Sequence, residues 1–245
     1  GGLTLSKAVV KKVLNQEIDY SVVINFSGFV KIVDLLGGIS VDIERSFDDF
    51  EYPIEGKEED PCGQKEEDLE KLATASSQLE VFPCRYEHIH FDKGLTLMNG
   101  QTALKYVRSR HAKGEEGTDF ARSKRQERVI SAIRQKALSL EILINPGKVL
   151  SLYSAVGESI HTDINQAEFD DFIKLAQKLN NATIQSGILD AGDEGKKRKG
   201  LLKIPTISRE YNFEWALIPR IGKDNYSEIH KYVECLLESG NCEVI

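Results

Sequence analysis

The chain has 245 residues, of which 40% are hydrophobic and 29% are charged, a balance typical of a globular protein. This length can bury a sizeable core, so we expect one large domain over residues 1–245. The formal net charge of −7 argues against a general nucleic-acid binder, which is usually basic. No apolar run reaches about 18 residues, so no segment is expected to span a membrane, and no signal peptide is recognisable.

The first part of the chain predicts alternating helices and strands. Residues 4–14 have helical periodicity, and residues 17–26, rich in Val and Ile, predict a buried strand. Ser27 is the expected N-cap of a helix that ends before Gly37, and ISVDIE at 39–44 alternates like a strand. Strand–helix–strand at this spacing predicts a βαβ unit. We therefore expect an α/β fold with three α/β/α layers around a central mixed sheet.

An acidic segment, 45–84, contains several Pro and Gly residues and predicts an exposed excursion with a helix over 66–78. Its carboxylates lack the spacing of a regular cation-binding loop. The next strand carries His88 and His90 on one face, and His111 follows later. Because a matching second Cys or His pair is missing, surface or network histidines are favoured over a zinc site.

The remaining elements are predicted from caps and periodicity. Asn99 or Gly100 begins a helix to about Val107, Asn145-Pro146 begins another, and 191–200 predicts a hairpin-like loop whose basic residues could contact an acidic polymer or anionic lipid. Further expected elements are a helix at 168–179, strands at 183–190 and around Trp215, and a final helix from Asp224 or Asn225 to Leu237.

Four cysteines occur as two pairs that each bracket a short segment. Reduced cytosolic thiols have no reason to bracket loops, whereas an oxidising compartment favours disulfides. We predict disulfides Cys62–Cys84 and Cys235–Cys242, and with them an extracytoplasmic location.

The most informative stretch is 104–140, which holds arginines in two clusters on either side of a GEEG turn. Thr118 or Asp119 is a plausible N-cap for a long helix after the turn. Residues on one face of that helix recur at steps of three and four: Arg122, Arg125, Gln126, Val129, Ile133, Ala137 and Leu140. Because the later residues are apolar, this face should aim the arginines at the edge of a core.

Arginines placed in this way predict an anion site. The guanidinium group offers a planar fork of donors that suits phosphate, and a helix N-terminus adds free N–H groups. With Arg108 and Arg110, the sum is a site for a di- or polyphosphate. The alternative is a solvated helix start in which Asp119 pairs with Arg122 at i, i+3.

The pattern R-x-R followed by D-x-x-R-x-x-R-Q, here VRSR and TDFARSKRQ, resembles the signature of the LytR-CpsA-Psr family. The segments 25–43 and 91–111 also resemble family motifs, in the same order and spacing, and the resemblance covers about residues 1–180. It implies a membrane-anchored, extracytoplasmic phosphotransferase. Such an enzyme moves a glycopolymer, such as teichoic acid or capsular polysaccharide, from a polyprenyl pyrophosphate carrier onto peptidoglycan.

The resemblance also implies site residues and a cofactor. The catalytic set would be Arg108, Arg110, Arg122, Arg125 and Asp119, and the pyrophosphate and lipid would contact Arg108, Arg110, Arg122, Gln126, Val129 and Ile133. Mg²⁺ is the implied cofactor. Family domains begin earlier, so the metal ligands and the membrane anchor are expected upstream of Gly1, and the metal residues are unassigned here. A non-catalytic module that binds polyprenyl phosphate or wall polymer is the alternative; nucleic acid is not an expected partner.

Overall fold

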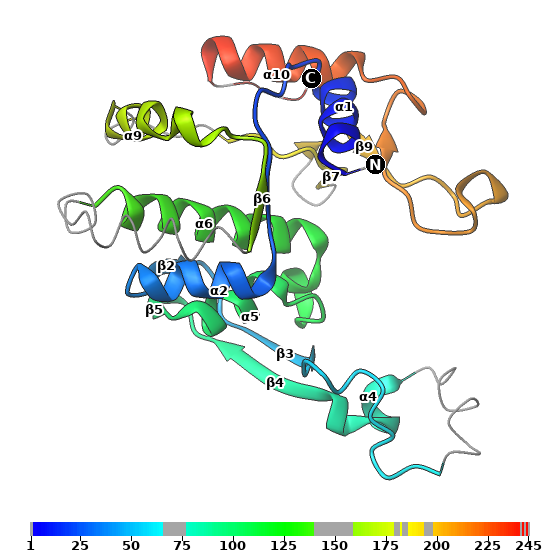
Figure 1. Ribbon diagram of the computed structural model, residues 1–245. Coiled ribbons are helices and arrows are strands. Elements are labelled where there is room, and N and C mark those ends of the chain that lie inside the picture. The colour runs from blue at the N-terminus through cyan, green and yellow to red at the C-terminus, as the bar shows by residue number, and fades with distance from the viewer. Residues whose placement is uncertain are drawn as a thin grey trace. The chain divides into compact units, whose positions relative to one another are not determined.

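The computed structural model describes residues 2–65, 77–139, 159–178, 182, 186–193, 198–240, 242 and 244 (Figure 1). The α-helices are α1 (Gly2–Leu14), α2 (Phe26–Leu35), α4 (Gln78–Val81), α5 (Gly100–Arg108), α6 (Asp119–Ala137), α9 (Phe169–Lys178) and α10 (Ser227–Ser239). The 3₁₀ turns are η2 (Pro83–Arg85), η3 (Gly114–Gly117), η4 (Gln166–Glu168) and η6 (Arg209–Tyr211). The strands are β1 (Val22–Ile24), β2 (Ile39–Ile43), β3 (Phe47–Pro53), β4 (Tyr86–Phe91), β5 (Gly94–Met98), β6 (Ile160–Thr162), β7 (Gly192–Asp193), β8 (Arg198–Lys199), β9 (Leu202–Lys203) and β10 (Ile218–Pro219).

The chain divides into two compact units, and the expectation of one domain over 1–245 stays a prediction. One unit is Val23–His161, and the other joins Gly1–Val22 to Thr162–Ile245. The first is called the central unit below, and the second the terminal unit. No helix among the described residues is long and apolar enough to cross a bilayer.

The core of the central unit lies between helices α2, α5 and α6 and the strands β2 to β5 (Figure 1). β2 runs antiparallel to β5, with Ile39 opposite Met98, and its alternate residues Ile39, Val41 and Ile43 are buried. β3 runs antiparallel to β4, with Phe47 opposite Phe91. This alternation follows from the two-residue period of a strand, which places every second side chain on the core face.

Helices α2 and α5 pack closely because a glycine begins α5. A β-carbon at Gly100 would lie 2.3 Å from the carbonyl oxygen of Val30, so any larger residue would push the helices apart. The Gly100 N–H donates to Asp34 Oδ1 at 2.7 Å, and Asn99 caps the same helix by accepting from Thr102 N. Asp34 therefore links α2 to the start of α5.

The α/β class is confirmed, but the sheets differ from the expected central mixed sheet. Among the described residues, the strands form five two-stranded sheets: β1–β6, β2–β5, β3–β4, β7–β8 and β9–β10, of which the last four are antiparallel. The predicted βαβ unit is wrong in its pairing, because β1 pairs with β6 and β2 with β5. Hydrophobic alternation specifies which face of a strand is buried, but it does not specify which strand lies at its edge.

Several local predictions need correction. The expected buried strand at 17–26 shortens to β1, whose three side chains are exposed, and Asn25 rather than Ser27 caps α2. The first part of the acidic excursion is strand β3, which buries Phe47, Asp49 and Tyr52 and whose register shifts between Asp49 and Tyr52. The strand expected around Trp215 is replaced by the turn η6 and a loop.

The remaining predictions divide into those confirmed and those not described. Both disulfides are present, Cys62–Cys84 and Cys235–Cys242. The hairpin at 191–200 is confirmed by the pair β7–β8, and the helix expected at 168–179 is α9. The helix after Asn145-Pro146 and most of the helix at 66–78 lie outside the described residues.

Candidate functional site

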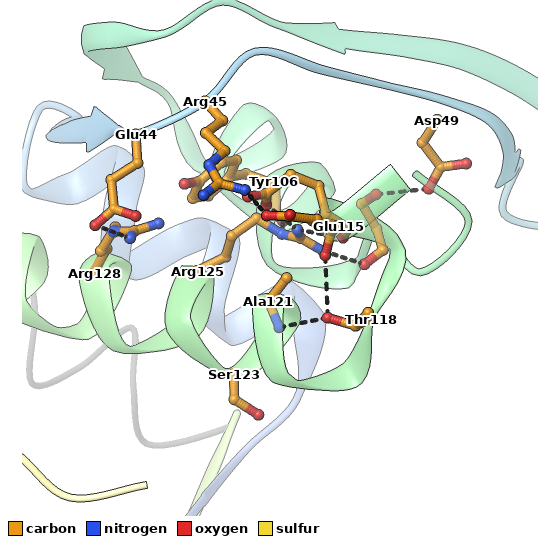
Figure 2. Close-up of polar contacts among 12 residues, drawn as sticks. Glu44, Arg45, Asp49, Tyr106, Glu115, Thr118, Ala121, Ser123, Arg125 and Arg128 are labelled. Carbon is orange, nitrogen blue, oxygen red and sulfur yellow. Dashed lines mark hydrogen bonds and ion pairs between the residues drawn. The ribbon is translucent and has the colours of Figure 1, made fainter. Parts of the chain in front are cut away.

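The two arginine clusters are joined by a tight turn between α5 and α6, residues 109–118, called the arginine turn below. Thr118 is the N-cap of α6: its Oγ1 accepts from the Ala121 N–H at 3.1 Å (Figure 2). A β-carbon at Gly117 would lie 2.1 Å from the carbonyl oxygen of Ala112, so the turn can close only with glycine at that position. The chain is thereby brought back on itself within ten residues.

Arg125 is fully buried beneath this turn (Figure 2). Its Nε donates to the Tyr106 carbonyl at 3.1 Å and its Nη2 to the Ser109 carbonyl at 2.7 Å. Its Nη1 donates to both the carbonyl and the carboxylate of Glu116 at 2.8 Å, and its guanidinium lies 4.9 Å from the Phe47 ring. Burial lowers the pKa of Arg125, while Glu116 acts against that shift. Arg125 thus ties the end of α5, η3 and α6 together.

Asp49 holds the other side of the arginine turn and was not identified from the sequence (Figure 2). This fully buried carboxylate accepts from Ser109 Oγ at 2.6 Å and from the His111 N–H at 3.2 Å, and its other oxygen accepts from the Glu51 N–H. Ser109 stands between the two arginines of the first cluster. One feature of the sequence could have identified Asp49. It lies two residues after Phe47 and therefore shares the core face of β3 with it.

The two clusters meet at Asp119, the first residue of α6. Arg122 Nη2 lies 3.0 Å from Asp119 Oδ1, and Arg110 Nη2 lies 3.7 Å from the same oxygen. Arg110 and Asp119 are exposed, and the Arg122 side chain is partly exposed. The i, i+3 pair that the sequence offered as an alternative is therefore present, and it shares its carboxylate with the first cluster.

Arg108 lies against aromatic rings. Its guanidinium is 4.3 Å from the Phe26 ring and 5.9 Å from the Tyr52 ring, and the side chain is partly buried. Burial raises the pKa of Tyr52, while the charge of Arg108 opposes that shift. A cation over an aromatic face is held by the ring quadrupole without a hydrogen-bonding partner.

The other predicted ligand contacts are placed differently. Gln126 is exposed, whereas Val129 is buried in the core cluster and Ile133 packs against that cluster. Val129 thus packs in the core of the described residues, and the apolar slot expected along this helix face stays a prediction. Helical periodicity places a residue on the inner face but does not specify whether protein atoms or a ligand fill the space beside it. Leu140 lies outside the described residues.

Two ion pairs flank the site: Arg128 pairs with Glu44, and Arg45 pairs with Glu115 (Figure 2). The hydrogen bond from Arg128 lowers the pKa of Glu44. These pairs bring the segment after β2 to α6 and η3, so the arginine turn is bordered by compensated charges.

Among the described residues, no group of carboxylates near the arginines is arranged to bind Mg²⁺. Asp119 faces two guanidinium groups, and Asp49 has its oxygens occupied by donors. Of the described residues, only Asp60, Cys62 and Cys84 group as closely as metal ligands, and both thiols are in the disulfide. The histidines form a surface network: His88 Nε2 and His90 Nδ1 each lie 2.8 Å from Asp48 Oδ1.

Known proteins show clear similarity to this chain. It is 28% identical over 174 residues to the polyisoprenyl-teichoic acid–peptidoglycan teichoic acid transferase TagU of Bacillus mycoides, covering 71% of this chain and 43% of that protein. It is 31% identical over 164 residues to Biofilm regulatory protein A of Streptococcus mutans, covering 67% of this chain and 32% of that protein. The chain thus spans less than half the length of these curated relatives.

The fold is also similar to that of solved structures. The crystal structure of B. subtilis TagU superimposes with a TM-score of 0.55 at 20% sequence identity, covering all of this chain and 75% of that one. The sequence pattern of the LytR_cpsA_psr family matches residues 1–199, which is most of the chain and includes both arginine clusters. This protein therefore belongs to the LytR_cpsA_psr family.

Proposed function

We propose that this chain carries the anion-binding site of a phosphotransferase that moves a glycopolymer from a polyprenyl pyrophosphate carrier to peptidoglycan. The observation that supports this most directly is the meeting of Arg110 and Arg122 at the single carboxylate of Asp119, at the N-terminus of α6. The teichoic acid transferase named among its relatives belongs to the same reaction class.

A pyrophosphate can compete for these arginines for a simple energetic reason. Ion pairs between exposed side chains contribute only about 0–1 kcal/mol. A charge-assisted hydrogen bond to a phosphate oxygen contributes about 1.5–3 kcal/mol. A dianionic group can therefore take the place of the Asp119 carboxylate beside Arg110 and Arg122, with the free N–H groups of α6 adding to the attraction.

The reaction proposed is phosphoryl transfer. A hydroxyl oxygen of the peptidoglycan acceptor bonds to the phosphorus that carries the glycopolymer, and the bond from that phosphorus to the bridging oxygen breaks. The carrier leaves as polyprenyl monophosphate, and the proton of the acceptor hydroxyl passes, directly or through solvent, to the oxygen of this leaving phosphate. Arg108, Arg110 and Arg122 would neutralise the charge on the leaving phosphate.

The sequence suggested that Arg125 is a catalytic residue, but in this proposal it has a structural role. All three nitrogens of its guanidinium donate within the protein, so it would act as a positioning residue that fixes the arginine turn. Asp49 would act in the same way from β3. Rigid placement matters because transition-state stabilisation depends on charges that do not reorganise during the reaction.

Mg²⁺ and the cellular location remain predictions. The metal would supply further positive charge to the pyrophosphate, with ligands outside the described residues. A lipid-linked donor and a cell-wall acceptor place the reaction on the extracytoplasmic face of the membrane, and the two disulfides fit such an oxidising location.

The binding test compares Arg122→Ala with Lys124→Ala, using a short-chain polyprenyl pyrophosphate in a calorimetric titration. Arg122→Ala should weaken binding about tenfold or more, because one charge-assisted contact is lost. Lys124 is exposed on the same helix and forms the matched control. Equal losses from both substitutions would show that general charge, and not this site, attracts the ligand.

Asp119 offers a second and sharper test. If its carboxylate only occupies the arginines until pyrophosphate arrives, Asp119→Asn should tighten pyrophosphate binding and leave transfer intact. If Asp119 is catalytic, the same substitution should abolish transfer of a lipid-linked glycan while binding persists. Binding by wild type with no transfer would favour the alternative of a non-catalytic binding module.

A further inference from the structure

The segment 204–217 of the terminal unit is a loop whose two ends are joined by paired strands. Lys203 lies opposite Ile218 and Leu202 opposite Pro219 in the antiparallel pair β9–β10. The loop projects from that pair as an excursion, drawn in orange in Figure 1. None of its fourteen residues is buried. We call it the apolar loop, because it is rich in large hydrophobic side chains.

The loop exposes large aromatic and aliphatic side chains, which are usually buried in a protein core. Phe213 is 70% exposed and Trp215 is 77% exposed. Three aliphatic side chains are exposed with them: Ile204, Ile207 and Leu217. Single exposed apolar residues are common on proteins, whereas five among fourteen consecutive residues are a concentration typical of interaction sites.

The tip of the loop has a defined backbone structure. The turn η6 is followed by Asn212 and Phe213, both in the left-handed region, with φ of 51° and 57°. The N–H of Phe213 donates to the Ser208 carbonyl at 3.0 Å, and the N–H of Glu214 donates to the Tyr211 carbonyl at 2.9 Å. A left-handed phenylalanine is disfavoured, so the backbone keeps Phe213 outward at a conformational cost.

The sequence that contains the loop is basic, although the whole chain is acidic. Residues 196–223 contain eight Lys and Arg against two Glu, a net of +6, in a chain of net −7. The basic residues are Lys196, Lys197, Arg198, Lys199, Lys203, Arg209, Arg220 and Lys223. Three of them form ion pairs: Arg198 with Asp190, Arg220 with Glu228 and Lys223 with Glu210. Apolar and aromatic side chains bordered by lysine and arginine complement the surface of an anionic bilayer, where hydrocarbon lies beneath negative headgroups.

We propose that the apolar loop is a membrane-contact element, which inserts Phe213 and Trp215 into the interface of an anionic lipid surface. Trp prefers this interface because its ring is apolar and its N–H can reach water or a headgroup. A soluble anionic polymer would use the basic residues but not the aliphatic ones. The loop lies beyond residues 1–199, which match the family pattern.

Trp215 reports directly on this proposal, because it is the only tryptophan in the chain. The experiment titrates the whole chain with vesicles of phosphatidylcholine that contain or lack phosphatidylglycerol, and follows tryptophan fluorescence. Vesicles with phosphatidylglycerol should shift the emission to the blue, and brominated acyl chains should quench it. Added salt should weaken binding, because the basic residues contribute.

Two variants separate the apolar and the electrostatic contributions to vesicle binding, and both retain Trp215 as the fluorescent probe. Phe213→Glu should weaken vesicle binding about tenfold or more, because an inserted ring is replaced by a charge. Arg209→Glu should weaken it by about fivefold or more, since each basic residue near an anionic surface contributes roughly that factor. Leu95→Glu is the matched control: Leu95 is exposed on β5 and should leave binding unchanged.

Three outcomes would overturn the proposal. The first is unchanged fluorescence with anionic vesicles while circular dichroism shows a folded chain. The second is a blue shift that grows with protein concentration in the absence of lipid, together with a dimer in sedimentation, which would assign the loop to self-association. The third is equal binding to a soluble polyphosphate without quenching by brominated lipid, which would assign it to an anionic polymer.

Discussion

The arginine turn and the apolar loop place their side chains in opposite ways. In the arginine turn, a guanidinium and a carboxylate, Arg125 and Asp49, are fully buried. In the apolar loop, Phe213 and Trp215 are mostly exposed. Charge can be buried at the turn because hydrogen-bond partners surround it, whereas the apolar loop has no core residue and is closed by its own turns and the pair β9–β10. Burial is decided by the available partners, not by residue type alone.

The largest expected effect is the loss of stability in Arg125→Ala. Removing the guanidinium leaves the Glu116 carboxylate and the carbonyls of Tyr106 and Ser109 without their donor. Breaking a buried ion pair in this way costs about 3–5 kcal/mol. Urea denaturation should show this loss, while Arg110→Ala, which removes an exposed group, should change stability by about 0.5 kcal/mol or less. Similar losses in both variants would contradict the structural role assigned to Arg125.

The next effect concerns Asp49 on the other side of the arginine turn. Asp49→Ala leaves Ser109 Oγ and the His111 N–H without their acceptor and should cost about 1–3 kcal/mol. Hydrogen exchange should speed up at His111, because its amide is no longer bonded. Pyrophosphate binding should weaken as well, because the turn between the arginines relaxes. Unchanged exchange at His111 would mean that Arg125 alone holds the turn.

A smaller effect is expected from Asp48, which neighbours Asp49 but is partly exposed. Hydrogen bonds from His88 and His90 lower the pKa of Asp48, and hydrogen bonds to Asp48 and Asp92 raise the pKa of His90. The His90 contribution to stability is present below its ordinary pKa of 6.5 and is lost as the pH rises through the raised value. The Asp48 contribution is present above 3.8 and is lost as the pH falls through the lowered value.

The measurement for this network is the difference in melting temperature between wild type and His90→Gln. The difference should be largest in mildly acidic solution, between the two ordinary pKa values, and should shrink well above neutral pH. His161→Gln serves as the control, since His161 lies outside the Asp48 network. A difference that does not depend on pH would show that the protonated His90 ring adds nothing to stability.

The smallest expected effect on stability is that of Trp215→Ser in the apolar loop. An exposed side chain outside the core should change the free energy of unfolding by about 0.5 kcal/mol or less, even though Trp is the largest side chain. Chemical denaturation followed by circular dichroism measures this value. A loss of about 3 kcal/mol or more, as in the truncation of buried aromatic residues, would show that the ring packs in the protein and would remove the basis of the membrane-contact proposal.

The sequence by itself determined the family, the α/β class, both disulfides, the long helix after the GEEG turn with Thr118 or Asp119 as its N-cap, and the candidate arginines. These follow from local rules: capping residues, hydrophobic periods, paired cysteines and a motif of fixed spacing. Only the tertiary structure decided that Arg125 is buried beneath the arginine turn, that Asp49 reaches from β3 to Ser109, and that β2 pairs with β5. Each of these depends on which distant segment supplies a partner, and a local pattern contains no record of that partner.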